Sequence, residues 1–134
     1  MSALDPAALE RVGAVAKSWE AACRSLDNDA IVSHLRDDAK VWYNFDPGTE
    51  HDREAYRKIL NDSAATFRNQ RYEDMRVNLH PGGFVEQATL IGDTDKGEVA
   101  TPFLLVATVQ GDKITRVAEY FDTSIMHQAG LAGG

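Results

Sequence analysis

The stretch Lys113-Ile-Thr-Arg-Val-Ala-Glu-Tyr-Phe-Asp-Thr123 is rich in β-branched and aromatic residues, which is typical of a β-strand. Successive side chains of a strand point to opposite faces, so Val117, Glu119 and Phe121 share one face. If that face lines a closed apolar cavity, Glu119 is a carboxylate among hydrophobic groups, and such a group is suited to acid–base chemistry. The stretch therefore predicts a chemically active carboxylate wherever the chain closes a cavity over this strand.

The first half of the chain has mainly helical spacing. Asp5 followed by Pro6 is typical of a helix start, and apolar residues then recur at helical intervals. A group of aromatic and β-branched residues later on indicates one strand among the helices. The expected elements are a helix from Pro6 to about Leu26, a short helix that contains Ile31 and ends near residues 36–38, a strand at 40–45, and a helix capped by Asp52 that reaches Phe67.

After Phe67 the pattern changes to the alternation of strands, and short links between them predict an antiparallel meander. Gly111 and Asp112 have the form of a two-residue hairpin turn. Pro102 predicts a bend or an edge position in its strand, because proline lacks the N–H that a sheet needs. The expected strands cover residues 70–80, 84–92, 98–110 and 113–123, and residues 124–131 are expected to form a last helical turn.

This order of elements predicts one α+β domain over residues 1–134. In the expected fold a curved, mostly antiparallel sheet forms a cone around the long N-terminal helix, with three helices in all and a pocket in the cone. An open sheet with three helices on one face is the alternative that the order allows.

The composition limits which binding partners and which cellular location can be expected. The chain of 134 residues has a net charge of −7 and no basic patch, so neither nucleic acid nor an anionic membrane is expected. No apolar run approaches membrane-spanning length, and the N-terminus lacks the segments of a signal peptide. Cys23 is the only cysteine, which indicates a reducing compartment, and we expect a cytoplasmic protein.

No motif predicts a metal or a cofactor. The four histidines are isolated in the sequence, without the HxH or HExxH spacing of metal ligands. Glycine-rich phosphate motifs and a nucleophile elbow are missing as well. We therefore expect no metal site and no cofactor.

The order of elements, with Asp37-Asp-Ala-Lys-Val-Trp-Tyr-Asn44 and Gly111-Asp-Lys-Ile-Thr-Arg-Val-Ala-Glu-Tyr-Phe-Asp122, resembles the nuclear transport factor 2-like superfamily. Within it the chain is similar to the SnoaL-like branch, which includes polyketide cyclases, ketosteroid isomerases and limonene epoxide hydrolase. The resemblance covers nearly the whole chain and implies a cone with a deep pocket, usually in a homodimer formed through the outer face of the sheet. This fold hosts many chemistries, so the resemblance indicates the fold more strongly than the reaction.

The ketosteroid isomerase pattern does not fit the residue types. Its aspartate base, tyrosine and protonated aspartic acid would fall at Tyr43, Trp19 and Leu104. Tryptophan and leucine cannot give the short hydrogen bonds that bind an enolate oxygen. The match therefore indicates pocket positions and not that mechanism.

The limonene epoxide hydrolase pattern fits in part. Its Asp-Arg-Asp set falls at Thr89, Gln87 and Glu119. Its tyrosine and asparagine fall at Trp42 and Asn44. One carboxylate and the asparagine are kept, but the arginine and the acid that would protonate the leaving oxygen are not.

The two patterns place different residues of the first strand in the pocket, so Tyr43, Trp42 and Asn44 all remain candidates. On the strand at 84–92, the face with Gln87 and Thr89 is expected to line the pocket, where these side chains would orient a substrate or a water. The candidate catalytic residues are Glu119, Asn44 and Tyr43, and the candidate substrate-binding residues are Trp19, Trp42, Gln87, Thr89, Leu104, Phe121 and His127.

The sequence predicts a cofactor-free acid–base enzyme for a hydrophobic small molecule, acting as an isomerase, a lyase or dehydratase, a cyclase or a hydrolase. Glu119 would be a base, or an acid if burial raises its pKa. A non-catalytic small-molecule binder and a dimeric protein-interaction module are the alternatives. A cavity with an unpaired Glu119 favours the enzyme, a salt-bridged Glu119 in a filled core favours the interaction module, and a Glu119 held by backbone hydrogen bonds favours the binder.

Overall fold

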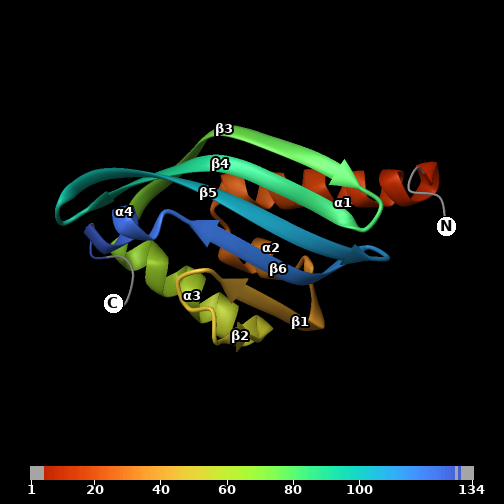
Figure 1. Cartoon of the computed structure of the whole chain (residues 1–134), viewed down its shortest axis with the longest axis horizontal. Helices are drawn as coiled ribbons and strands as arrows, with labels where there is room; N and C mark the ends of the chain where they lie inside the picture. The colour runs from red at the N-terminus through yellow and green to blue at the C-terminus, as the bar shows by residue number, and fades with distance from the viewer. Residues whose placement is uncertain (1–4, 129, 131–134) are drawn as a thin grey trace.

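The computed structural model describes residues 5–128 and 130, and in it a long helix lies behind a strongly curved sheet (Figure 1). The long helix begins as its sequence predicts, because the Asp5 side chain accepts a hydrogen bond from the backbone N–H of Ala7 at 3.1 Å. Asp52 caps the third helix in the same way, through the N–H of Ala55 at 2.8 Å. The helices are α1 (Pro6–Ser25), α2 (Asn28–Val32), α3 (Arg53–Thr66) and the short α4 (Thr123–Gln128). None of the helices in the described residues has the length and the apolar character needed to cross a bilayer.

One mixed sheet contains all six strands in the order β2-β1-β6-β5-β4-β3. Neighbouring strands are antiparallel except β1 and β6, which run parallel. The sheet curves without closing, because β2 and β3 lie at its two edges. The predicted α+β cone is therefore confirmed. The strands are β1 (Leu35–Tyr43), β2 (Glu50–His51), β3 (Arg68–His80), β4 (Gly83–Thr94), β5 (Gly97–Gln110) and β6 (Lys113–Phe121).

Two irregularities in β3 contribute to the curvature. The pairing of β3 with β4 shifts register between Arg68 and Arg71 and again between Glu73 and Arg76. Asn69 (φ 52°) and Asp74 (φ 54°) lie at these shifts in the left-handed region, which Asn and Asp tolerate better than most residues. Because a bulge bends its strand and increases the local twist, β3 can curve around α1, against which it packs.

The second helix and the first strand differ from their predicted bounds. The helix was expected to end near residues 36–38, but α2 ends at Val32 and β1 already begins at Leu35. The reason is pairing with β6, where the N–H of Ile114 donates to the carbonyl of His34 at 2.9 Å and Leu35 lies opposite Ile114. Tertiary pairing thus overrides the helical spacing of this segment.

Pro102 occupies the edge position that its chemistry requires. β5 pairs with β6 only from Phe103 onward, so Pro102 has a strand neighbour on the β4 side alone. At the C-terminus the expected helical turn over residues 124–131 corresponds to α4, and residues 129 and 131 lie outside the described residues.

Candidate active site

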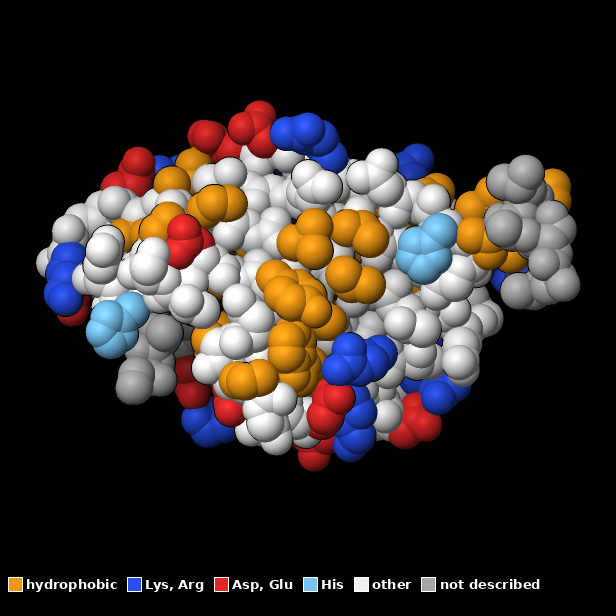
Figure 2. All heavy atoms as spheres, in the orientation of Figure 1, with side chains coloured by type: hydrophobic (Ala, Val, Ile, Leu, Met, Phe, Trp, Pro, Cys, Tyr) orange, Lys and Arg blue, Asp and Glu red, His pale blue; other side chains and the backbone are white. Residues whose placement is uncertain are grey.

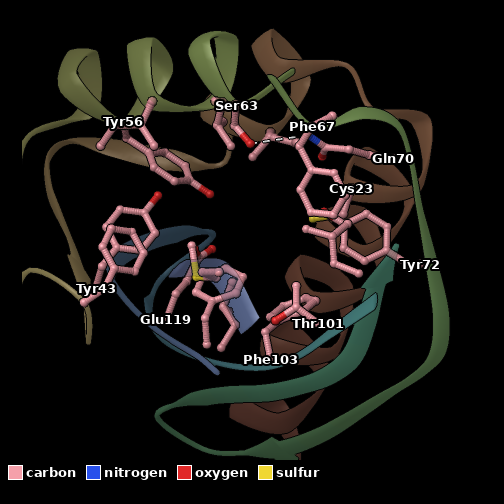
Figure 3. Close-up of a pocket in the computed structure, with 18 of the residues that line it drawn as sticks. Cys23, Tyr43, Tyr56, Ser63, Phe67, Gln70, Tyr72, Thr101, Phe103 and Glu119 are labelled. Carbon is pink, nitrogen blue, oxygen red and sulfur yellow. Dashed lines mark hydrogen bonds between the residues drawn. The ribbon is translucent and has the colours of Figure 1, made fainter. Parts of the chain in front are cut away.

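A cavity of about 340 Å³ opens between the concave face of the sheet and helices α1 and α3 (Figure 3). This volume is at the small end of the range for small-molecule pockets. Most of its wall is apolar, with aromatic rings that pack on one another, such as Tyr43 on Phe45 at 4.8 Å and Phe103 on Phe121 at 5.5 Å between ring centroids. Among the described residues that line it, none is Lys, Arg or His.

The register of the sheet places two carboxylates on the concave face. Tyr43 of β1 lies opposite Glu119 of β6, Glu119 lies opposite Leu105 of β5, and Leu105 lies opposite Glu86 of β4. Residues directly opposite one another on neighbouring strands point to the same face. Strands lie about 4.8 Å apart, so the Cα atoms of Glu119 and Glu86 are roughly 10 Å apart with Leu105 between them.

Glu119 is held in its neutral form by its surroundings. The residue is 8% exposed, and burial among apolar groups is the largest cause that raises its pKa, to about 8. The negative charge of Glu86 raises the pKa further, while the hydroxyl of Tyr56 opposes the rise because it favours the charged carboxylate. A carboxyl with a pKa near 8 can donate or accept a proton at neutral pH.

Two tyrosines accompany Glu119 at one side of the cavity. Tyr43 comes from β1 and Tyr56 from α3, and in Figure 3 their hydroxyls and the Glu119 carboxyl point into the same part of the cavity. Burial raises the pKa of both phenols well above the ordinary value, and the charge of Glu119 adds to the rise. Both hydroxyls therefore stay protonated and can donate hydrogen bonds to an oxygen of a ligand.

Glu86 is the second buried carboxyl of the cavity. It is 1% exposed, and neither of its oxygens has a hydrogen-bond partner among the described residues. Burial is the main cause that raises its pKa, to about 7, and the nearby indole of Trp19 lowers it in part without reaching hydrogen-bond geometry. Glu86 is thus a titratable group without a structural role in any described hydrogen bond.

One wall of the cavity depends on a glycine. The ring of Phe67 lies directly on Gly92 of β4, and a Cβ at that position would come within 1.8 Å of the ring. Phe67 caps the end of α3, where its N–H donates to the carbonyl of Ser63 at 2.8 Å. Only glycine lets this ring close the cavity against β4.

Four of the predicted site residues line the cavity, namely Glu119, Tyr43, Trp19 and Phe121. Tyr43 is 3% exposed and Trp19 is 1% exposed. Of the two patterns that disagreed on the first strand, the one that placed Tyr43 in the pocket agrees with the structure.

Four other predicted residues lie on the opposite, convex face. Gln87, Thr89 and Leu104 line a separate and more open hollow there, beside Tyr120. The ring of Trp42 packs on Tyr120 at 5.2 Å, and its indole N–H donates to the carbonyl of Pro47 at 3.0 Å. The expectation that these four contact a substrate in the cone therefore does not agree with their positions. For Gln87 and Thr89 the cause is the face chosen for β4, where Glu86, and not Gln87, points inward. Leu104 and Trp42 were placed by the resemblance, and in each case the next residue along the strand lines the cavity, Leu105 and Tyr43 respectively.

Asn44 and His127 also lie away from the cavity lining. The Asn44 amide donates to the carbonyl of Phe121 and accepts from the N–H of the same residue, both at 3.0 Å. Asn44 thus joins the end of β1 to the end of β6, so its geometry is that of a structural residue. His127 is exposed on α4, and its neighbour Met126 lines the cavity instead.

Sequence reasoning missed Glu86 and Tyr56, although a signal was present for Glu86. Phe84, Glu86 and Ala88 share one face of β4, and this face is the more apolar of the two. An acid on the apolar face of a strand is the same signal that identified Glu119. Tyr56 shares helical spacing with Ile59 and Leu60, which predicts only an apolar helix face, and no pattern indicates that its hydroxyl reaches the cavity.

Within the described residues, no group of three or more His, Cys, Asp or Glu side chains is arranged to hold a metal ion. The polar groups that face the cavity are instead carboxyls, hydroxyls and amides, including Ser63, Gln70 and Thr101. These groups suit proton transfer and hydrogen bonding to an organic ligand.

No family model and no curated protein matches the sequence. Solved structures do match the fold. BvnE pinacolase from Penicillium brevicompactum has a TM-score of 0.79 and 14% identity, over 96% of this chain and 92% of that one. A candidate polyketide cyclase from Xanthomonas campestris pv. campestris has a TM-score of 0.76 and 19% identity, over 94% and 99% of the two chains. TerC, co-crystallised with polyporic acid, has a TM-score of 0.76 and 17% identity, over 89% and 97%. The chain therefore shares the fold of these proteins, which is the α+β cone that the resemblance to the nuclear transport factor 2-like superfamily implies.

Proposed function

We propose that this protein is a cofactor-free enzyme that transfers a proton within a small, largely apolar organic molecule, with Glu119 as the proton-transfer group. The observation that carries the proposal is the position of Glu119, which faces a ligand-sized aromatic cavity and forms no ion pair with any described residue. The fold is also that of a pinacolase and of a candidate polyketide cyclase, which supports a small-molecule enzyme.

The geometry favours a reaction that moves a proton beside a carbonyl or hydroxyl oxygen. In its charged form Glu119 accepts a proton from carbon, and it returns that proton to another atom of the same ligand. The hydroxyls of Tyr43 and Tyr56 donate hydrogen bonds to the oxygen that gains charge. Isomerisation, elimination of water and cyclisation all follow this scheme. An anionic substrate is disfavoured, because the described lining has acids and no cationic side chain.

The alternatives fit the site less well. A protein-interaction module would have a filled core with a salt-bridged Glu119, whereas the structure has a cavity. A passive binder would hold Glu119 by backbone hydrogen bonds, whereas no backbone group of the described residues hydrogen-bonds its side chain, and the side-chain group that acts on it is the hydroxyl of Tyr56. TerC, which has a similar fold, was co-crystallised with polyporic acid, which supports a small-molecule ligand for either an enzyme or a binder.

The test uses 5-nitrobenzisoxazole, a flat, neutral compound whose ring opens when a base removes one proton and which gives a coloured product. The protein should accelerate this opening, and the rate should rise with pH with a midpoint near pH 8 and a plateau about one unit higher, because Glu119 must be ionised to act as the base. Glu119→Gln should lose about 10²-fold or more of the rate while circular dichroism stays unchanged.

Glu73→Gln is the matched control, because Glu73 lies opposite Thr89 on the convex face and is exposed. This variant should keep the full rate. If Glu119→Gln turned over the probe as fast as the unchanged protein, Glu119 would not be the proton-transfer group. Binding of the probe without acceleration would favour the passive binder.

We also propose that two copies associate through the convex face. The rings of Trp42 and Tyr120 lie together there, Tyr120 is 43% exposed, and Figure 2 shows hydrophobic side chains gathered over the middle of this face. An exposed apolar patch with a polar surround is typical of an association surface. A second copy would cover this patch without blocking the cavity, which opens on the other side of the sheet.

A further inference from the structure

Two residues at the deep end of the cavity have buried polar atoms without a protein partner. Among the described residues, the buried side-chain atoms that lack a hydrogen bond are Nε1 of Trp19 and both carboxyl oxygens of Glu86. Each residue is 1% exposed. Buried polar atoms in native proteins are nearly always hydrogen-bonded, so orphaned ones in a cavity wall indicate where a ligand supplies the partner.

The orphaned atoms lie together and face the cavity. Trp19 comes from α1 and Glu86 from β4, and both are buried in the cavity wall, whereas Asp62 and Thr66 of the same wall are exposed. The Trp19 indole is near enough to lower the pKa of the Glu86 carboxyl. One small group of a ligand can therefore contact both residues.

The chemistry of the two residues restricts what that group can be. The indole N–H only donates a hydrogen bond, and Glu86, once ionised above its pKa of about 7, only accepts. A hydroxyl meets both needs at once, because its oxygen accepts from the indole while its hydrogen donates to the carboxylate. An ether oxygen only accepts and an ammonium group only donates. A ligand carboxylate would be repelled by the charge of Glu86.

We propose that the deep end of the cavity is a binding site for a hydroxyl group of the ligand, which accepts from Trp19 Nε1–H and donates to Glu86. The ligand class is thus a neutral, mostly apolar alcohol or phenol. The role of that ligand as a substrate rests on the proposed proton-transfer function, but its binding does not. The hydroxyl lies across Leu105 from Glu119, so the two carboxyls hold the ligand from different sides.

Four probes of similar shape separate the possibilities by calorimetric titration at pH 8, where the Glu86 carboxyl, with its pKa of about 7, is mostly ionised. They are 4-ethylphenol, which donates and accepts, ethylbenzene, which does neither, 4-ethylanisole, which only accepts, and 4-methylbenzylamine, which is a cation. We expect 4-ethylphenol to bind about tenfold or more tightly than the other three, because a hydrogen bond to a charged, buried group adds that much. Equal affinity for 4-ethylphenol and ethylbenzene, or tighter binding of the amine, would overturn the proposal.

Variants at Glu86 test whether this residue causes the preference for 4-ethylphenol over ethylbenzene. Glu86→Leu removes the acceptor and keeps an apolar side chain, and it should abolish the preference for 4-ethylphenol over ethylbenzene. Gln87→Leu on the same strand is the control, because Gln87 is exposed on the convex face, and it should leave the preference unchanged. If Glu86→Leu does not fold, Glu86→Gln gives the same test with a reduced preference expected. A preference that survives both changes at Glu86 would show that the hydroxyl binds elsewhere.

The two tryptophans of the chain give an independent readout by NMR. The Trp19 indole N–H has no partner and should shift downfield when 4-ethylphenol binds, but not when ethylbenzene binds. The Trp42 indole N–H is already bonded to Pro47 on the convex face, so its signal should stay in place. If the chemical shift of the Trp19 indole N–H did not change at saturating 4-ethylphenol, the proposal would be contradicted.

The hydroxyl site and the proton-transfer function can each be contradicted without the other. A protein that prefers 4-ethylphenol but does not open 5-nitrobenzisoxazole has the hydroxyl site and lacks the proposed catalysis. A protein that opens 5-nitrobenzisoxazole through Glu119 and shows no preference among the four probes has the catalysis and lacks the hydroxyl site.

Discussion

The two faces of strands β4, β5 and β6 carry different chemistry, although neighbouring residues of the same strands build both. Glu86, Leu105 and Glu119 point into the cavity and are 1%, 2% and 8% exposed. The residues beside them, Gln87, Leu104 and Tyr120, form part of the convex surface. On the concave face, burial raises the pKa of both carboxyls, to about 7 for Glu86 and about 8 for Glu119. Because side chains alternate between the two faces of a strand, an error of one residue in assigning the faces predicts residues of the outer surface as site residues.

The largest difference between the faces should appear in packing, with Leu105 and Leu104 as a matched pair. Leu105→Ala should lower the free energy of unfolding by roughly 2–5 kcal/mol, because it leaves a hole between the two carboxyls in a packed layer. Leu104→Ala should cost about 1 kcal/mol or less, because Leu104 is half-buried at the convex surface. Urea denaturation measures both values, and equal losses would mean that the two faces are packed alike.

The second difference concerns pH. The pKa values of Glu86 (about 7) and Glu119 (about 8) in the folded protein lie above the unfolded value near 4.5, so the folded state binds more protons between pH 4.5 and 8. The contribution of these two carboxyls to the free energy of unfolding is therefore greatest below pH 4.5, and it falls as the pH rises to about 8. The rise of the Glu86 pKa from 4.5 to about 7 alone corresponds to about 3 kcal/mol of the free energy of unfolding.

Glutamine at either position removes the proton that titrates. Urea denaturation at pH 5 and pH 9 should show that Glu119→Gln and Glu86→Gln lose less stability across this interval than the unchanged protein does. The exposed Glu73→Gln on the convex face should behave like the unchanged protein. A Glu119→Gln variant with the original pH dependence would mean that Glu119 is not buried in its neutral form.

The smallest effect on the fold should come from the convex face itself. Tyr120→Glu places a charge in the proposed contact between copies, and it should convert a dimer to a monomer with little change in the unfolding of the monomer. Light scattering with size-exclusion chromatography measures the mass. A dimer that persists in Tyr120→Glu would place the contact elsewhere, and a monomeric unchanged protein would remove the proposed dimer.

Local signals in the sequence predicted most of the fold. Helix caps at Asp5 and Asp52, the two-residue turn at Gly111 and the edge position of Pro102 each depend on the chemistry of one or two residues. Leu35 was misplaced in a helix because its strand partner, Ile114, lies far along the chain. The residues around Leu35 alone do not indicate pairing with a strand so distant in the sequence.

The candidate site was predicted less completely, for a physical reason. Glu119 was found because its strand face also carries Val117 and Phe121, so the apolar surroundings were visible in the sequence. On β4 the polar residues Gln87 and Thr89 were assigned to the pocket by resemblance, although the more apolar face holds Glu86. The hydroxyl of Tyr56 comes from α3, and only the packing of that helix over the sheet brings it to Glu119.

The protonation of the two inner carboxyls tests the account most directly. Carbon-13 NMR of the glutamate side chains, assigned with Glu119→Gln and Glu86→Gln, follows each carboxyl as the pH is raised from 3 to 10. The account predicts that these two carboxyls titrate with midpoints near 8 and 7, and that a bound ligand changes both. Midpoints near 4.5 for both would contradict it, because the concave face would then be as accessible to water as the convex one.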